Sequence, residues 1–225
     1  MQKQTLIEGL RALPGDAHLL ASLASLLESQ KQWQELQQVL LEQLPLLPRG
    51  SELEAHACYL AARASLELGD LRQALPLCER SLQLQPNRWY SHHIHGRVLS
   101  DLGRPAAALQ AQQRCAELAP DFPWCWFEIG HLQRAQAETV AARDALERAL
   151  ALQQLREPGD VAPFREALDA LNREVSLAER QQAAANLWPG RSLPGPDERL
   201  PAIDELALSL EQFRLFLDRC EGRPG

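Results

Sequence analysis

Three of the six histidines fall in one short stretch, SHHIHG, as His92, His93 and His95. His92 and His95 are spaced i, i+3, so in a helix they would lie on one face, as two imidazole ligands of a metal ion can. Cys78, in the preceding helical segment, could add a thiolate. His93 would point elsewhere, so the three imidazoles do not converge. We therefore expect histidines held by hydrogen bonds rather than a metal site.

The sequence contains none of the short motifs that build common active sites. There is no G-x-S-x-G, no H-E-x-x-H, no P-loop and no G-x-G-x-x-G. Glu52 and Glu54 form a carboxylate pair, but the pair lies in a connector and is typical of solvated charge. We expect a non-catalytic chain that needs no cofactor.

Composition narrows the class of protein further. The 225 residues are rich in Leu, Ala, Gln, Glu and Arg, which favour helices, and the net charge of -7 argues against nucleic-acid binding. No secretory signal and no apolar run of about 18 residues is present, so we expect no membrane contact and a cytoplasmic location. The five cysteines form no C-x-x-C pair and are expected to be reduced and mostly buried: Cys58, Cys78, Cys115, Cys125 and Cys220.

A period of 34 residues organises the first two thirds of the chain. It separates Gly69 from Gly103, and also Ala74 from Ala108 and Pro86 from Pro120. Each period predicts two amphipathic helices, with glycine at the turn between them and proline after the second. Two departures stand out. Ala137-Glu138 replaces the Gly-Asp turn and should loosen it, and SELE at 51–54 inserts four residues and should alter the twist.

This pattern resembles the tetratricopeptide repeat (TPR) family, and PDFPWCWFEIGHL is similar to repeats of bacterial, especially cyanobacterial, arrays. The resemblance implies an all-α fold, a right-handed α-solenoid with a concave face and C-terminal capping helices. We place a TPR array at 1–156, with a half unit at 1–14 and units at about 17–50, 55–88, 89–122 and 123–156. A capping helix at 157–188, a linker at 189–199 and an apolar helix at 200–221 would follow.

Within the family, positions 2, 5, 9, 12 and 13 of each first helix line the concave groove. Transferred to this sequence, these positions hold more aromatic and basic residues than the acidic chain as a whole. The first unit is blander there, with His18, Ala21, Ser25, Glu28 and Ser29. The candidate groove residues are His56, Tyr59, Arg63, Tyr90, His93, Arg97, Trp124, Phe127, His131 and Arg134.

These residues indicate a protein-interaction scaffold that binds an extended peptide. The arginines would bind acidic side chains and the aromatic residues apolar ones. Lys and Asn, which hold a C-terminal carboxylate in some family members, are absent from the corresponding positions. The first alternative is the targeting region of a larger or partner glycosyl-, sulfo- or methyltransferase. The second is a module that forms a homodimer through residues 200–221.

Overall fold

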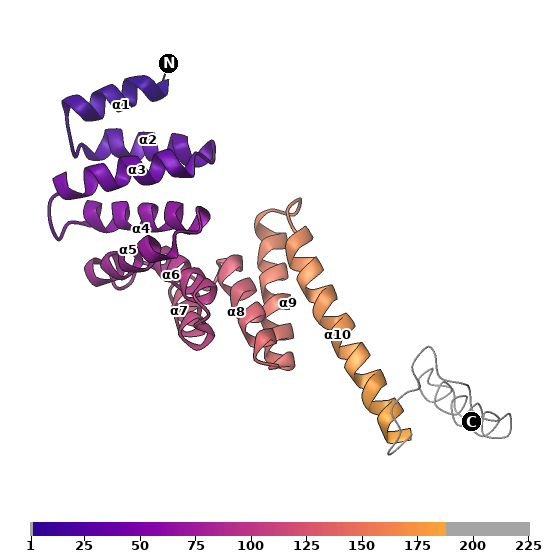
Figure 1. Ribbon diagram of the computed structural model, residues 1–225. Coiled ribbons are helices and arrows are strands. Elements are labelled where there is room, and N and C mark those ends of the chain that lie inside the picture. The colour runs from indigo at the N-terminus through magenta and orange to yellow at the C-terminus, as the bar shows by residue number, and fades with distance from the viewer. Residues whose placement is uncertain (1, 188–225) are drawn as a thin grey trace, which may run out of the picture. The chain divides into compact units, whose positions relative to one another are not determined.

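The computed structural model describes residues 2–187, and within them every element is helical (Figure 1). The predicted linker at 189–199 and apolar helix at 200–221 lie outside the described residues. The helices are α1 (Gln2–Ala12), α2 (Ala17–Ser29), α3 (Trp33–Gln43), α4 (Glu52–Glu67), α5 (Leu71–Leu84), α6 (Trp89–Asp101), α7 (Pro105–Leu118), α8 (Pro123–Ala135), α9 (Thr139–Arg156) and α10 (Ala162–Leu187), with a 3-10 turn η1 (Leu44–Leu46). None of these helices is long and apolar enough to cross a membrane.

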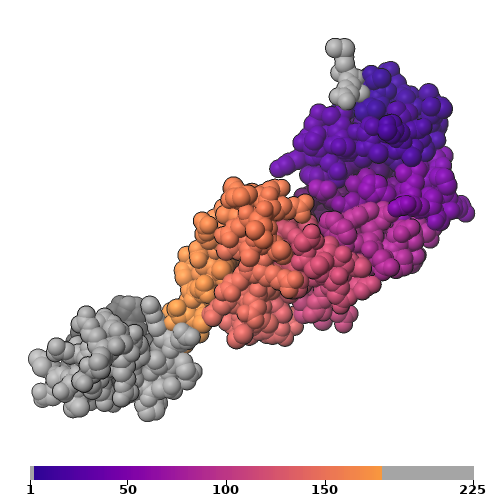
Figure 2. Space-filling model, turned by 180° about the vertical axis from the view of Figure 1, so that it is seen from behind, coloured from indigo at the N-terminus to yellow at the C-terminus, as the bar shows by residue number. Residues whose placement is uncertain are grey.

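Residues 1–176 form one compact unit and 177–225 a second. In the first unit the helices follow one another as pairs, α2 with α3, α4 with α5, α6 with α7 and α8 with α9 (Figure 1). We call the first member of each pair the A helix and the second the B helix. Each colour band of this unit lies against the bands before and after it (Figure 2). The predicted all-α solenoid is thus confirmed.

The turn between A and B helices has the same conformation in all four pairs. Its central residue has a positive φ at Lys31 (54°), Gly69 (74°), Gly103 (71°) and Ala137 (61°). Asp70 N–H donates to Ser65 O at 2.8 Å, and Glu138 N–H donates to Gln133 O at 2.9 Å in the same way. The expectation of a looser turn at Ala137-Glu138 is therefore wrong. The hydrogen bonds are kept, and Ala137 adopts the backbone conformation that favours glycine.

The four inserted residues lengthen α4 at its N-terminus by nearly one turn. Ser51 caps the helix, because its Oγ accepts the N–H of Glu54 at 3.0 Å. The Glu54 carboxylate accepts the N–H of Gly50 at 2.6 Å, which anchors the incoming connector. The insertion thus becomes a capped helix end.

The interior depends on close approach of the paired helices. Gly130 of α8 faces Leu146 of α9, and a Cβ built on Gly130 would lie 2.7 Å from the Leu146 Cγ. Four thiols, at Cys58, Cys78, Cys115 and Cys125, are free and buried, as expected; Cys220 lies outside the described residues.

Helix α10 covers the last pair. Its Phe164 and Leu171 are buried, and Leu171 packs in one cluster with Ala142 and Leu146 of α9. The repeat array is therefore closed at this end by a helix that does not itself belong to the 34-residue pattern.

Candidate functional site

A pocket of about 380 Å³ opens where the first three A helices meet. Residues of α4, of the N-terminus of α6 and of one face of α2 line it. We call it the aromatic pocket because rings from α4 and α6 form one wall. Its lining residues are Ala21, Ala24, Ser25, Glu28, His56, Tyr59, Leu60, Trp89 and Tyr90.

The rings of this wall contact one another across the boundary between two repeats. The centroid of Tyr59 lies 4.5 Å from that of Tyr90 and 5.8 Å from that of His56. Trp89 lies 5.4 Å from Tyr90 and 4.6 Å from Phe122, which continues the row into the next unit. Such mutual packing fixes the rings in place, so a ligand would meet a preformed apolar wall.

The wall of rings from α4 and α6 is uncharged near neutral pH. Burial lowers the pKa of His56, which favours its neutral form. Burial also raises the pKa of both Tyr59 and Tyr90, so their hydroxyls stay protonated. On the opposite side α2 contributes the small, exposed side chains of Ala21 and Ser25, together with the carboxylate of Glu28, which is paired with Arg63. The pocket therefore suits an apolar group that enters past α2.

The candidate residues of α8 have a different environment. Trp124 and Phe127 pack against Phe164 of α10, with ring centroids 4.8 and 5.1 Å apart. The rings of His131 and Phe127 meet edge to face, with their centroids 4.4 Å apart. Arg134 binds both carboxylate oxygens of Glu174, also on α10. The structure thus places Trp124, Phe127 and Arg134 against the capping helix rather than beside the aromatic pocket, and His131 packs on Phe127.

The groove arginines are already engaged in ion pairs. Arg63 of α4 binds Glu28 of α2 at 2.8 Å, and Arg97 of α6 binds Glu67 of α4 at 3.2 Å. Each arginine side chain is 36% exposed, so an added anion can still approach. These pairs join successive A helices, although half-exposed pairs of this kind contribute only about 0–1 kcal/mol to stability. An acidic ligand would have to share Arg63 and Arg97 with their glutamate partners.

The SHHIHG histidines separate in the structure. His92 Nε2 lies 2.8 Å from the carbonyl oxygen of Pro86, and His93 Nδ1 lies 3.1 Å from Oε1 of Gln112. His95 is partly buried, which lowers its pKa. Within residues 2–187, no three His, Cys, Asp or Glu side chains are placed to hold a metal ion. The hydrogen bonds of His92 and His93 are of the kind expected for structural histidines.

We expect acidification to destabilise the array through His93. Burial, the main cause, lowers its pKa to about 4, with Arg97 and Arg63 acting in the same direction. The unfolded-state pKa is near the ordinary value of about 6.5, so the folded state prefers the neutral ring. The stability gained above pH 6.5 is then lost as the pH falls toward 4. Urea unfolding between pH 7 and pH 4.5 measures this loss.

The matched comparison uses His93→Gln, which keeps a hydrogen-bonding group but removes the titration. Its unfolding free energy should fall less steeply with pH than that of the wild-type chain. His18→Gln, at an exposed position of α2, serves as the control and should follow the wild type. Equal slopes for wild type and His93→Gln would show that His93 does not carry the effect.

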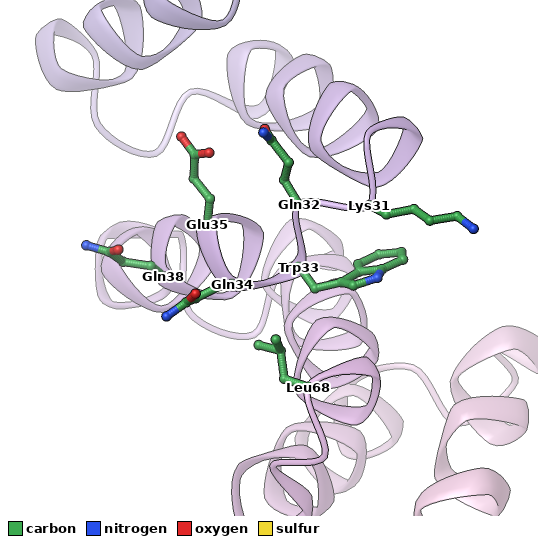
Figure 3. Close-up of a pocket in the computed structure, with 7 residues that line it drawn as sticks. All are labelled: Lys31, Gln32, Trp33, Gln34, Glu35, Gln38 and Leu68. Carbon is green, nitrogen blue, oxygen red and sulfur yellow. The ribbon is translucent and has the colours of Figure 1, made fainter.

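A second pocket, of about 470 Å³, lies at the turn end of the first two helix pairs (Figure 3). The indole of Trp33 extends between Lys31 and Leu68, and the guanidinium of Arg63 lies 5.5 Å from the Trp33 ring. Glu35, another lining residue, already binds Lys3 at 2.9 Å. The repeat pattern gives no sign of this pocket, because the 42% exposure of its lining residue Leu68 is visible only in the structure.

The five positions transferred from the family leave out three residues of the aromatic pocket, Ala24, Leu60 and Trp89. These residues occupy positions 8, 6 and 1 of their units. Of the candidates, His56, Tyr59 and Tyr90 line the pocket, and Arg63 is joined to it through Glu28. His93 contacts Phe122 at 5.2 Å in the same row of rings. Apart from Arg97, which is paired with Glu67 and Glu128, the candidate residues thus divide into a pocket group and a cap group.

Comparison with known proteins agrees with this architecture. Residues 55–88 and 90–122 match the family model of the tetratricopeptide repeat. A search of curated proteins finds no match. The fold is similar to that of MamA (18% identity, 68% of this chain and 88% of MamA covered, TM-score 0.59) and of the Sgt2 TPR domain from Aspergillus fumigatus (17%, 68% and 93%, 0.53).

A third similar structure is the first TPR of Spaghetti (RPAP3) bound to the HSP90 peptide SRMEEVD. It is 14% identical, covers 56% of this chain and 96% of its own, and has a TM-score of 0.51. At such identities the likeness concerns the fold alone. Together with the four helix pairs and their shared turn, it identifies the fold as that of tetratricopeptide repeat proteins, and residues 55–88 and 90–122 match the sequence pattern of that family.

Proposed function

We propose that this chain is a non-catalytic, cytoplasmic scaffold whose groove binds an extended protein segment carrying apolar and acidic side chains. The aromatic pocket is the observation that carries the proposal. Its rings come from two successive A helices, and a third A helix, α2, supplies the opposite wall. An extended segment laid across the A helices would place one bulky apolar side chain in this pocket, as peptide ligands do with their anchors.

The acidic preference rests on Arg63 and Arg97. Both lie one repeat apart on the same face, and each keeps about a third of its side chain exposed. Their glutamate partners reduce the local positive charge, so the apolar anchor should contribute more affinity than the acidic contacts. The peptide-bound RPAP3 structure, which shares this fold, supports a protein ligand of this kind.

Filling the pocket should weaken ligand binding without unfolding the array. Ala21 and Ser25 are exposed and line the pocket from α2, so Ala21→Gln/Ser25→Gln would place two neutral side chains in it. Selection from a random octapeptide display library, followed by calorimetry with a synthetic enriched peptide, gives the affinity. Loss of one buried apolar anchor, about 1.5–3 kcal/mol, corresponds to about tenfold weaker binding or more.

Ala17→Gln/Ser22→Gln is the matched control, because it makes the same two substitutions at exposed positions of α2 outside the pocket. It should bind the selected peptide as the wild type does. The groove proposal fails if both variants bind alike, or if the wild-type chain enriches no sequence from the library.

A further inference from the structure

Arg88 is a buried cation that the repeat frame does not explain. It occupies the last position of its unit, just before α6, and its side chain is only 6% exposed. Its guanidinium lies 5.1 Å from the centroid of the Tyr90 ring. It provides no side-chain hydrogen bond to cap α6, so helix capping does not account for an arginine here.

The guanidinium is poorly satisfied by the protein. Nη2 donates to Oε1 of Glu52 at 3.2 Å, but Glu52 is 81% exposed. Nη1 is buried and has no hydrogen-bond acceptor within the part of the chain that the structure describes. A buried charge with an open donor is unfavourable for folding, so its presence calls for a ligand or a functional reason.

Arg88 adjoins the aromatic pocket through two of its lining residues. Tyr90 contacts the guanidinium on one hand and lines the pocket on the other. His56, which also lines the pocket, lies with its ring 6.1 Å from Tyr90. The pKa of His56 is lowered first by burial and then by the charge of Arg88, which places that charge close to the pocket wall.

We propose that Arg88 is the anion-binding end of the aromatic pocket, where it takes a carboxylate that stands next to the apolar anchor of the bound peptide. The inference rests on the proposed groove function. It adds that the bound peptide carries an acidic side chain next to its apolar anchor. Arginine offers two parallel donors to a carboxylate, and here one of them is still open. Glu52, held by a single hydrogen bond and largely exposed, would swing away when the ligand enters.

Arg88 is more deeply buried than Arg63 and Arg97. Both of those arginines are ion-paired on the face of the A helices and remain partly in water. The guanidinium of Arg88 is already desolvated and has an open donor, so a carboxylate bound there would meet a charge that water screens less. Arg88 should thus bind the acidic side chain next to the peptide's apolar anchor. Arg63 and Arg97 should contribute a weaker, salt-dependent attraction.

The test is selection of the same octapeptide library by four full-length chains: wild type, Arg88→Met, Arg88→Lys and Arg63→Ala/Arg97→Ala. We expect wild type to enrich peptides with Asp or Glu beside a bulky apolar residue. Arg88→Met should keep the apolar preference and lose the acidic one, and Arg88→Lys should retain part of it. Calorimetry with one enriched peptide and its Asp→Asn or Glu→Gln analogue should show about a tenfold difference for wild type and none for Arg88→Met.

Thermal unfolding separates this role from a structural one. Methionine keeps much of the arginine volume, and it removes a buried charge with an unpaired donor. The melting temperature of Arg88→Met should therefore equal or exceed that of wild type. A clearly lower melting temperature would make Arg88 a structural residue and would overturn the inference.

The remaining outcomes distinguish the two proposals. Two outcomes would overturn the role of Arg88 and leave the groove proposal intact. In the first, the wild-type chain enriches apolar peptides that carry no acidic residue. In the second, the acidic preference persists in Arg88→Met and disappears in Arg63→Ala/Arg97→Ala. Failure of the wild-type chain to enrich any peptide would overturn the groove proposal itself, and this inference with it.

Discussion

Replacement of Phe164 by alanine should lower the free energy of unfolding by about 3–5 kcal/mol, the range for a large aromatic side chain removed from a core. Phe164 is fully buried and is the contact between α10 and the rings of Trp124 and Phe127. Its loss would leave a cavity where the cap meets α8. Urea unfolding followed by circular dichroism measures the change, and limited proteolysis should cut within α10 sooner than in wild type.

Leu155→Ala provides the control for a leucine-sized loss at the surface of the same region. Leu155 is 85% exposed, so its replacement should change the unfolding free energy by less than about 0.5 kcal/mol. A small effect of Phe164→Ala, comparable with that of Leu155→Ala, would mean that α10 does not seal the array in solution.

The position of Phe164 also limits the length of the groove. Trp124, Phe127 and Arg134 occupy the same repeat positions as residues that would bind a ligand in a longer array, but here they contact α10. A peptide bound in the groove would therefore lie along α2, α4 and α6. The residues that contact the capping helix and the residues proposed to bind a ligand come from one repeated pattern.

The repeat pattern could predict most of the fold. Small residues at Ala74, Ala108 and Ala142 marked where B helices approach their partners, and all three are buried. The glycines at 69 and 103 marked turns with positive φ. The pattern could not predict the turn at Ala137. This residue keeps the positive φ that alanine disfavours, because neighbouring backbone hydrogen bonds hold the turn in place.

The candidate site was predictable only in part. The frame gives the face on which a residue lies, so it placed Tyr59 and Tyr90 correctly on a common surface. It does not give the register of α10, which lies outside the repeat, and so it could not show that Phe127 is covered. Arg88 was not predicted as a site residue because its position in the repeat normally lies in the connector between units. Only the structure shows that its side chain is buried.

Gly130→Ala should destabilise the array by about 1–3 kcal/mol, although alanine favours helices by about 1 kcal/mol over glycine. The new Cβ would lie 2.7 Å from Cγ and 2.9 Å from Cδ2 of Leu146, and 3.2 Å from the carbonyl oxygen of Ala142. Leu146 is fully buried and packs in one cluster with Ala167 and Leu171 of α10, so it can yield only by displacing these neighbours. Gly159→Ala is the control, because nothing lies within 4 Å of its Cβ, and it should be neutral or slightly stabilising.

The second helix pair suggests how the clash can be relieved. There the equivalent positions hold Ala62 and Cys78, a larger residue on the A helix facing a smaller one on the B helix, and both are buried. Gly130→Ala combined with Leu146→Cys copies that pair. Leu146→Cys alone should leave a cavity, but in the double variant the added methyl group occupies part of that space. The two changes should therefore destabilise the array by 0.5–3 kcal/mol less than the sum of the single effects. Strict additivity would show that these two side chains do not share one space, and that the close approach of α8 and α9 is set elsewhere along the helices.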